Sequence, residues 1–258
     1  MATLIAEPRP APLKEREPVE AWLIFRYSPV TLFSLKMSRA TSTAGKTLLI
    51  PTPYSVKMAF VDAGLRHQLV ADPERFIREL SKTPLRIGVP QHACVTGTIQ
   101  SVRQEVRDVE RKKNPNLPLY RASIAMREFV HYSGRLSLAF KIDGGETDFT
   151  EALMRIGPAI NYFGKRGSFF QYRETEWLAD LDITFSEPDG SAAGPPGWGH
   201  IATLDDFGPK ASFSALNSFS PIAIQAGVHR KFVETMIPLG VHNSGPGFVH
   251  YCAPGAIL

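Results

Sequence analysis

The first ordered stretch of the chain, AWLIFRYS, alternates two sets of side chains. One set comprises Leu23, Phe25 and Tyr27, and the other comprises Trp22, Ile24 and Arg26. An alternation with period two predicts a β-strand. Residues 1–18, which precede it, are rich in proline and charge, and we expect them to form a mobile leader.

Two helices are predicted next, each entered through a proline. The first covers about Tyr54 to Gln68, with Thr52 as its N-cap and Pro53 at its first position, where the missing N–H costs nothing. The second, DPERFIRELSK, uses Asp72 and Pro73 in the same way. Apolar residues recur at helical spacing in both, at Val56, Ala59, Phe60 and Ala63 and then at Phe76, Ile77 and Leu80.

Two strand candidates, LRIGV and ACVTGTI, lead into a polar segment at about residues 101–121 that we interpret as a projecting insertion. Val102, Val106 and Val109 leave a short amphipathic helix open as the alternative to a hairpin there. A long strand, EFVHYSGRLSLAFKI, then precedes the helix DFTEALMRIGPAINYF, with Asp148 as its cap and a kink at Pro158. GKRGSFFQYRETEWLADLDITF returns as extended chain.

The predicted order of elements is strand, helix, strand, strand, helix, strand. This order predicts an α+β fold of the ferredoxin-like, or RNA-recognition-motif, type. We expect this domain to occupy residues 19–185, including the basic insertion, and residues 186–258 to form a loop followed by a small β-rich region of short strands between Gly and Pro residues.

Composition narrows the class of protein. The 29 Lys and Arg residues exceed the 25 Asp and Glu residues, which favours a polyanionic partner such as nucleic acid. The two cysteines, Cys94 and Cys252, and the seven histidines show no metal-ligand spacing, so no metal or cofactor is predicted. Without an apolar segment long enough to span a bilayer or a recognisable signal peptide, the chain is predicted to be cytoplasmic and without a membrane partner.

Two turns carry the most informative chemistry. PTPYSVK opens the first helix, and its Lys57 lies one turn in, where a cation opposes the helix dipole unless an anion is bound. GKRGSFFQ places Lys165 and Arg166 between two glycines that let a phosphate approach the backbone. Phe169 and Phe170 follow on opposite faces of a strand, so that one is expected in the core and at most one can stack on a base.

These features predict a surface that binds the backbone of single-stranded RNA. The candidate RNA-binding residues are Lys36, Arg39, Lys46, Tyr54, Ser55, Lys57, Arg111, Lys112, Lys113, Lys165, Arg166 and Phe169. The three in the insertion have a competing interpretation as an ordinary solvated loop, because acidic residues are interleaved with them.

Three parts of the chain together resemble the Cas-five family of CRISPR-associated proteins, in the RAMP superfamily. They are the segment LKMSRATSTAGKTLLIPTPYSVKMAFVDAG, the basic insertion, and the segment INYFGKRGSFFQ that follows it. The resemblance covers roughly residues 20–185. It implies a ferredoxin-like domain with a projecting thumb that holds the 5′ handle of the CRISPR RNA (crRNA), as a non-catalytic subunit of a type I Cascade complex. The implied partners are crRNA and the backbone and large Cascade subunits, while contact with target DNA stays open.

Two other functions are weighed against this one. A subgroup of the family cleaves precursor crRNA without metal, and Tyr54, Lys57 and His131 are residue types suited to that reaction. A stand-alone single-stranded RNA-binding protein is the second alternative, and it differs in not copurifying with other subunits. TAGKT mimics the end of a P-loop, but Ala40 occupies the place of its required glycine, so an NTPase is rejected.

Overall fold

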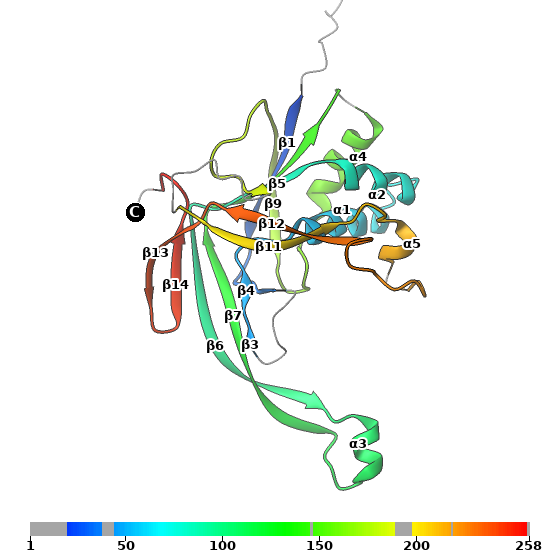
Figure 1. Ribbon diagram of the computed structural model, residues 1–258, viewed down its shortest axis with the longest axis vertical. Coiled ribbons are helices and arrows are strands. Elements are labelled where there is room, and N and C mark those ends of the chain that lie inside the picture. The colour runs from blue at the N-terminus through cyan, green and yellow to red at the C-terminus, as the bar shows by residue number, and fades with distance from the viewer. Residues whose placement is uncertain (1–19, 38–43, 145–146, 189–197, 218, 257–258) are drawn as a thin grey trace, which may run out of the picture.

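The computed structural model describes residues 20–37, 44–144, 147–188, 198–217 and 219–256 (Figure 1). Four strands form its central antiparallel sheet in the order β5-β8-β1-β9: β1 (Ala21–Pro29), β5 (Leu85–Gly88), β8 (Leu136–Ile142) and β9 (Phe170–Leu178). Helix α1 (Pro53–Arg66) connects the first two of these in sequence, and α4 (Asp148–Ile156) connects the last two. This is the ferredoxin-like βαββαβ arrangement, so the α+β fold predicted from the sequence is confirmed.

The helices cover one face of this sheet. Leu23, Phe25 and Tyr27, one of the two alternating sets of β1, are buried on this face. Phe25 packs edge-to-face against Phe60 of α1, and the Tyr27 hydroxyl donates a hydrogen bond of 2.8 Å to the carbonyl of Gly157. On the opposite face, Ile24 belongs to a second buried cluster.

The helix starts follow the cap chemistry in the sequence, with one exception. The Thr52 side chain accepts from the Ser55 N–H, and Asp72 caps α2 (Pro73–Lys82) in the same way. At α4, however, the cap is Thr147 and not Asp148, because the Thr147 hydroxyl accepts from the Thr150 N–H while Asp148 lies in the first turn. The helix also does not continue through a kink at Pro158, since it ends at Ile156 and a 3-10 turn, η1 (Gly157–Ala159), follows.

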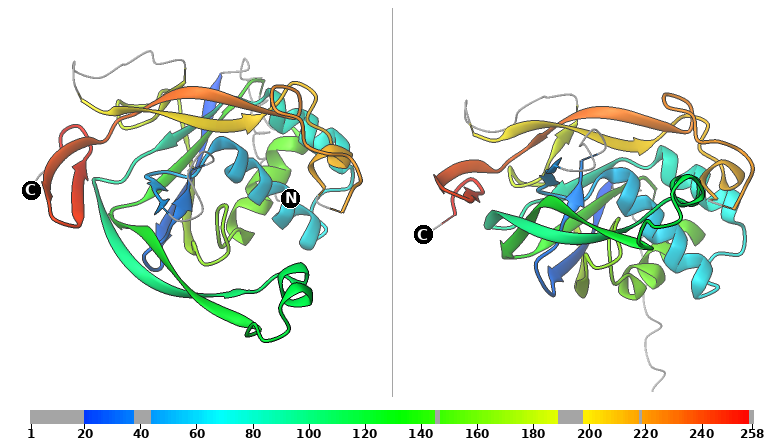
Figure 2. Two further views of the ribbon diagram at one scale, coloured as in Figure 1. Left: turned by 60° about the horizontal axis from the view of Figure 1, so that its bottom comes forward. Right: turned by 90° about the horizontal axis from the view of Figure 1, so that it is seen from below.

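A two-stranded arm projects from this body (Figures 1 and 2). It consists of β6 (His92–Glu105) and β7 (Tyr120–Ser133), paired along their whole length, with the short helix α3 (Asp108–Lys113) at its tip. The insertion predicted at 101–121 is therefore only the outer part of a longer hairpin. The single long strand predicted from Glu128 onward is interrupted, because Gly134, with a φ of 114°, separates β7 from β8.

The C-terminal strands join the rest of the structure in two places. β14 (Phe248–Cys252) pairs with the base of β6 in the sheet β13-β14-β6-β7-β3, with β13 (Gly240–Gly245) and β3 (Ala44–Gly45) at its edges. β11 (His200–Phe207) pairs with β12 (Arg230–Ile237) and packs on α1, while β10 (Glu187–Pro188) extends this second sheet. The remaining elements are β2 (Leu35–Lys36) paired with β4 (Thr47–Leu48), and α5 (Phe213–Leu216).

Among the residues described, no helix has the length and apolar character needed to cross a membrane.

We expect Gly157→Ala to destabilise the protein. A Cβ at this position would lie 2.3 Å from the ring of Phe25, which is itself fully buried, so the core must move to accept the methyl group. Overpacking of this kind costs about 1–3 kcal/mol, measurable by thermal or denaturant unfolding. Gly97→Ala in β6 is the control, because apart from its two chain neighbours no residue has an atom within 4 Å of the added Cβ. Equal stabilities for the two variants would contradict this packing.

Candidate nucleic-acid interface

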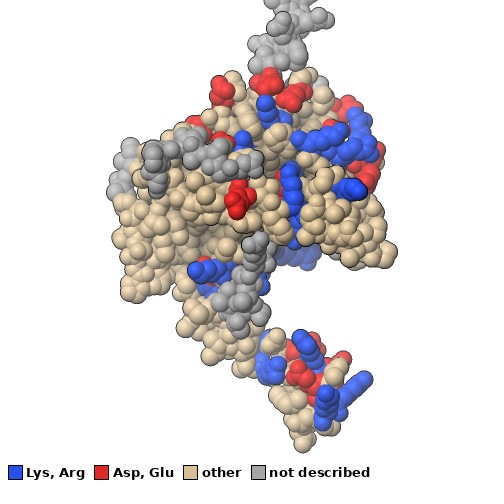
Figure 3. Space-filling model, viewed as in Figure 1, with Lys and Arg blue, Asp and Glu red and all other residues tan. Residues whose placement is uncertain are grey.

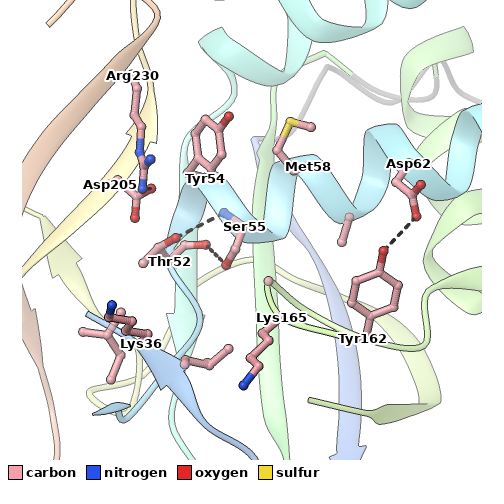
Figure 4. Close-up of a pocket in the computed structure, with 14 residues that line it drawn as sticks. Lys36, Thr52, Tyr54, Ser55, Met58, Asp62, Tyr162, Lys165, Asp205 and Arg230 are labelled. Atoms are coloured by element: carbon pink, nitrogen blue, oxygen red, sulfur yellow. Dashed lines mark hydrogen bonds and ion pairs between the residues drawn. The ribbon is translucent and has the colours of Figure 1, made fainter. Parts of the chain in front are cut away.

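A cavity of about 600 Å³ opens where α1 begins (Figure 4). β2 contributes Lys36, α1 contributes Tyr54 and Ser55, and the glycine turn after η1 contributes Gly164 and Lys165. A Cβ placed on Gly164 would lie 3.6 Å from the Cβ of Ser55, so the two turns are in direct proximity. The structure thus brings together two segments about 110 residues apart in sequence, as expected from the fold.

The start of α1 gives this cavity a positive end. Its first turn contains no acidic residue, and the Thr52 hydroxyl satisfies one backbone N–H, that of Ser55, at 3.2 Å. The Ser55 hydroxyl in turn donates to the Thr52 carbonyl at 2.8 Å. A helix N-terminus favours negative charge through its backbone N–H groups and its dipole.

The charged groups around the cavity differ in whether the protein already neutralises them. Asp205 pairs with Arg230, and Asp62 pairs with Arg66 and accepts from the Tyr162 hydroxyl at 3.5 Å. Lys36 and Lys165, in contrast, are exposed and have no ion pair within the part of the chain that the structure describes. These two lysines are therefore the cavity's available positive charges.

Lys57 does not belong to this surface, which corrects its assignment as an RNA-binding residue. Its side chain is almost completely buried, and Nζ lies 2.8 Å from Oδ1 of Asp206 in β11 and 5.7 Å from the centre of the Phe207 ring. Burial lowers the pKa of Lys57, and the neighbouring Asp206 carboxylate opposes that shift. The cation that opposes the α1 dipole is thus compensated by a carboxylate of the protein and not by a bound anion.

Tyr54 lies in the cavity beside the ion pair of Arg230 and Asp205. The guanidinium of Arg230 lies over its ring, 4.8 Å from the ring centre, and Arg230 also pairs with the buried Asp205. Burial raises the pKa of Tyr54, with Asp205 adding to the effect and Arg230 opposing it. A phenol with a raised pKa keeps its proton at neutral pH, so it can donate a hydrogen bond but is poorly suited to act as a base.

The glycine turn has the backbone geometry that its sequence predicts. Gly164 and Gly167 have φ values of 67° and 101°, in the region that favours glycine. Lys165 and Arg166 are both exposed, but Lys165 lines the cavity and Arg166 does not. Phe170 is buried, which confirms that one of the pair lies in the core, and Phe169 is 46% exposed.

The other predicted residues are spread more widely. Lys46 is exposed between β3 and β4, and Arg39 falls outside the described residues. Arg111, Lys112 and Lys113 lie on α3 at the tip of the arm, where Arg111 is 3.7 Å from Asp108 and Arg121 is 3.5 Å from Glu110. Both signs of charge are intermingled there, as Figure 3 shows.

The three residues considered for RNA cleavage do not line a common cavity. Tyr54 lines the cavity, Lys57 is buried behind it, and His131 is exposed in β7, away from the cavity lining.

Within the described residues, no three His, Cys, Asp or Glu side chains are placed to share a metal ion.

Sequence analysis missed Arg230 and Asp205, which complete the cavity wall. They lie in β12 and β11, in the region that the sequence marked only as short strands. The one available signal was the adjacent pair Asp205 and Asp206 at the end of an apolar strand, because two carboxylates at the edge of a core require positively charged partners.

Comparisons with known proteins give a structural likeness but no match to a protein family. No protein-family profile matches the chain, and no curated protein matches it. A solved structure described as a crystal structure of a CRISPR protein from Archaeoglobus fulgidus is similar to it, with 14% sequence identity and a TM-score of 0.42 over 91% of this chain and 92% of that chain. A likeness at this level supplies no argument about function, which must be inferred from the residues of this chain.

Proposed function

We propose that this protein is a non-catalytic RNA-binding subunit of a type I CRISPR interference complex, in which it caps the 5′ handle of the crRNA. The cavity at the start of α1 receives the phosphodiester backbone near the RNA end. The proposal includes contacts with the backbone and large subunits of the complex, a cytoplasmic location, and an RNA-binding domain spanning residues 19–185 with residues 186–258 appended.

The observation that carries this proposal is the pair of lysines in the cavity. Lys36 and Lys165 line the same cavity as the first turn of α1, and the carboxylates that line it already have partners. A phosphate placed there would gain two cations and the α1 dipole. Such a site binds backbone phosphate without requiring a particular base.

The architecture supports the same proposal. A ferredoxin-like body with a projecting arm is what the resemblance to the Cas-five family implies, and the arm ends in the basic residues of α3. Its shaft also carries the exposed apolar side chains Ile99, Ile124 and Met126. Exposed apolar residues on a projecting element are typical of a surface that contacts a partner. The separated positions of Tyr54, Lys57 and His131 favour holding RNA over cleaving it.

Purification from the native operon tests the proposal. We expect the chain to copurify with other subunits and with RNAs that share a common 5′ end, identified by sequencing the bound RNA. Recovery of the chain alone with RNAs of unrelated sequence would instead favour a stand-alone single-stranded RNA-binding protein. Shortening of a labelled precursor RNA by the chain alone would favour the endoribonuclease.

We expect reversal of charge at the tip of the arm to weaken assembly without unfolding the protein. Lys112 and Lys113 are exposed on α3, so Lys112→Glu with Lys113→Glu should change the unfolding free energy by less than about 0.5 kcal/mol. The yield of complex in a pull-down with the other subunits should fall. An unchanged yield, or a marked fall in melting temperature with RNA binding retained, would contradict this role.

A further inference from the structure

A second cavity, of about 510 Å³, lies beside the first. Leu48 of β4 lines both, so the two openings are separated by a single strand. The second opening is bounded by the base of the arm, β4, the β11–β12 sheet and β14. Lys46, exposed at the edge of β4, lines it as well.

Arg230 links the two cavities. Its guanidinium lies 4.8 Å from the centre of the Tyr54 ring in the first cavity and 5.9 Å from the centre of the Phe232 ring in the second. Buried Asp205 holds it in place. Arg230 therefore lies in the wall between the cavity that Lys36 and Lys165 line and the second opening, with its charge paired to Asp205.

The lining of the second cavity differs in chemistry from that of the first. It contains three ring systems, those of Phe232, His200 and Tyr251, the last two with ring centres 6.0 Å apart. It also contains the carboxylate of Glu128, whose Oε2 accepts from the Thr47 N–H at 2.9 Å. Burial raises the pKa of Tyr251, and the negative charge of Glu128 raises it further. The Glu128 carboxylate is therefore close to the Tyr251 phenol.

We propose that this second cavity is a nucleobase subsite, in which Phe232 stacks on the base adjoining the bound phosphate and Glu128 reads its hydrogen-bonding edge. This inference rests on the proposed RNA-binding function and adds base selectivity to it. Planar rings stack on aromatic side chains whatever the base, so Phe232 contributes affinity. An ionised carboxylate only accepts hydrogen bonds, so Glu128 selects bases that donate.

The chemistry favours guanine at this position. Among the four RNA bases, guanine alone presents two adjacent donors, N1–H and the N2 amino group, on its Watson–Crick edge, the edge exposed in single-stranded RNA. The two carboxylate oxygens of Glu128 together have about four lone-pair sites, so the bond from Thr47 leaves acceptor capacity. Uracil presents one donor between two carbonyl acceptors. The carboxylate oxygens repel both of these carbonyl oxygens.

The test measures binding of the full chain to a short oligouridylate in which one position carries G, A, C or U in turn. Wild-type protein should prefer G at one position by about tenfold. Glu128→Gln should abolish that preference, since glutamine can still accept from Thr47 but is no longer a charged acceptor. Glu151→Gln, exposed on α4 and outside the lining of both cavities, is the matched control and should retain the preference.

A second pair of variants tests the stacking ring. Phe232→Ala should weaken binding of all four oligonucleotides about tenfold. Phe219→Ala, which removes a 95% exposed ring outside both cavities, should not.

The outcomes separate the two proposals. Salt-sensitive binding that is indifferent to the base, or a G preference that survives Glu128→Gln, overturns the subsite and leaves the proposed function standing. No binding of any of the four RNAs overturns both.

Discussion

Replacing Lys57 by alanine is expected to lower the melting temperature of the protein by about 6–12 °C. The variant leaves Asp206 at the end of β11 without the cation that lies 2.8 Å away, and it opens space beside the Phe207 ring. Removing one partner of a buried pair costs about 3 kcal/mol or more, because the other charge stays partly buried. For a protein of this size, 1 kcal/mol corresponds to a shift of about 2–4 °C.

The matched control is Lys165→Ala, which removes an exposed lysine without an ion pair in the described structure and should leave the melting temperature unchanged. A double variant, Lys57→Met with Asp206→Asn, removes both charges and should recover much of the lost stability. If Lys57→Ala instead weakens RNA binding at an unchanged melting temperature, Lys57 contacts RNA and its placement inside the protein is wrong.

Replacing Lys36 and Lys165 together by alanine is expected to weaken RNA binding about 100-fold with little effect on stability. Each lysine would lose one charge-assisted contact with a phosphate, worth about 1.5 kcal/mol. Both side chains are exposed, so their removal leaves no buried group unpaired. Titration of a labelled single-stranded RNA at low salt measures the effect, with a thermal melt to verify folding.

The control removes the same charge from outside the cavity. Arg166 lies next to Lys165 in the chain but not in the cavity lining, and Lys210 is exposed elsewhere. Arg166→Ala with Lys210→Ala therefore has the same net charge as the first double variant and should bind RNA nearly as well as wild type. Equal weakening by the two double variants would mean that binding follows overall charge and that the cavity has no special role.

The parts of the fold that the sequence predicted well are those fixed by local chemistry. Thr52 and Pro53 define the start of α1, alternation defines β1, and the glycines of the GKRG turn have the positive φ values expected of them. Their order along the chain was enough to identify the ferredoxin-like sheet. Thr147 was missed as the α4 cap because Asp148, equally good as a cap, is adjacent to it.

What the sequence could not predict depends on contacts between distant segments. Lys57 was assigned to the surface because nothing near it in the chain indicates that Asp206, about 150 residues later, reaches it. Arg230 and the second cavity depend in the same way on the packing of β11 against α1 and the pairing of β14 with β6. Helical spacing and turn residues contain no information about such pairings, which are set by the tertiary structure.

The salt dependence of RNA binding tests the central claim most directly. If Lys36 and Lys165 each neutralise one phosphate, the logarithm of the affinity for single-stranded RNA should fall with the logarithm of salt concentration with a slope of about −1.4 or steeper, at about 0.7 per phosphate. The slope for the Lys36→Ala, Lys165→Ala variant should be shallower by about 1.4. A wild-type affinity that does not change with salt, or an identical slope for the variant, would contradict the assignment of this cavity to the RNA backbone.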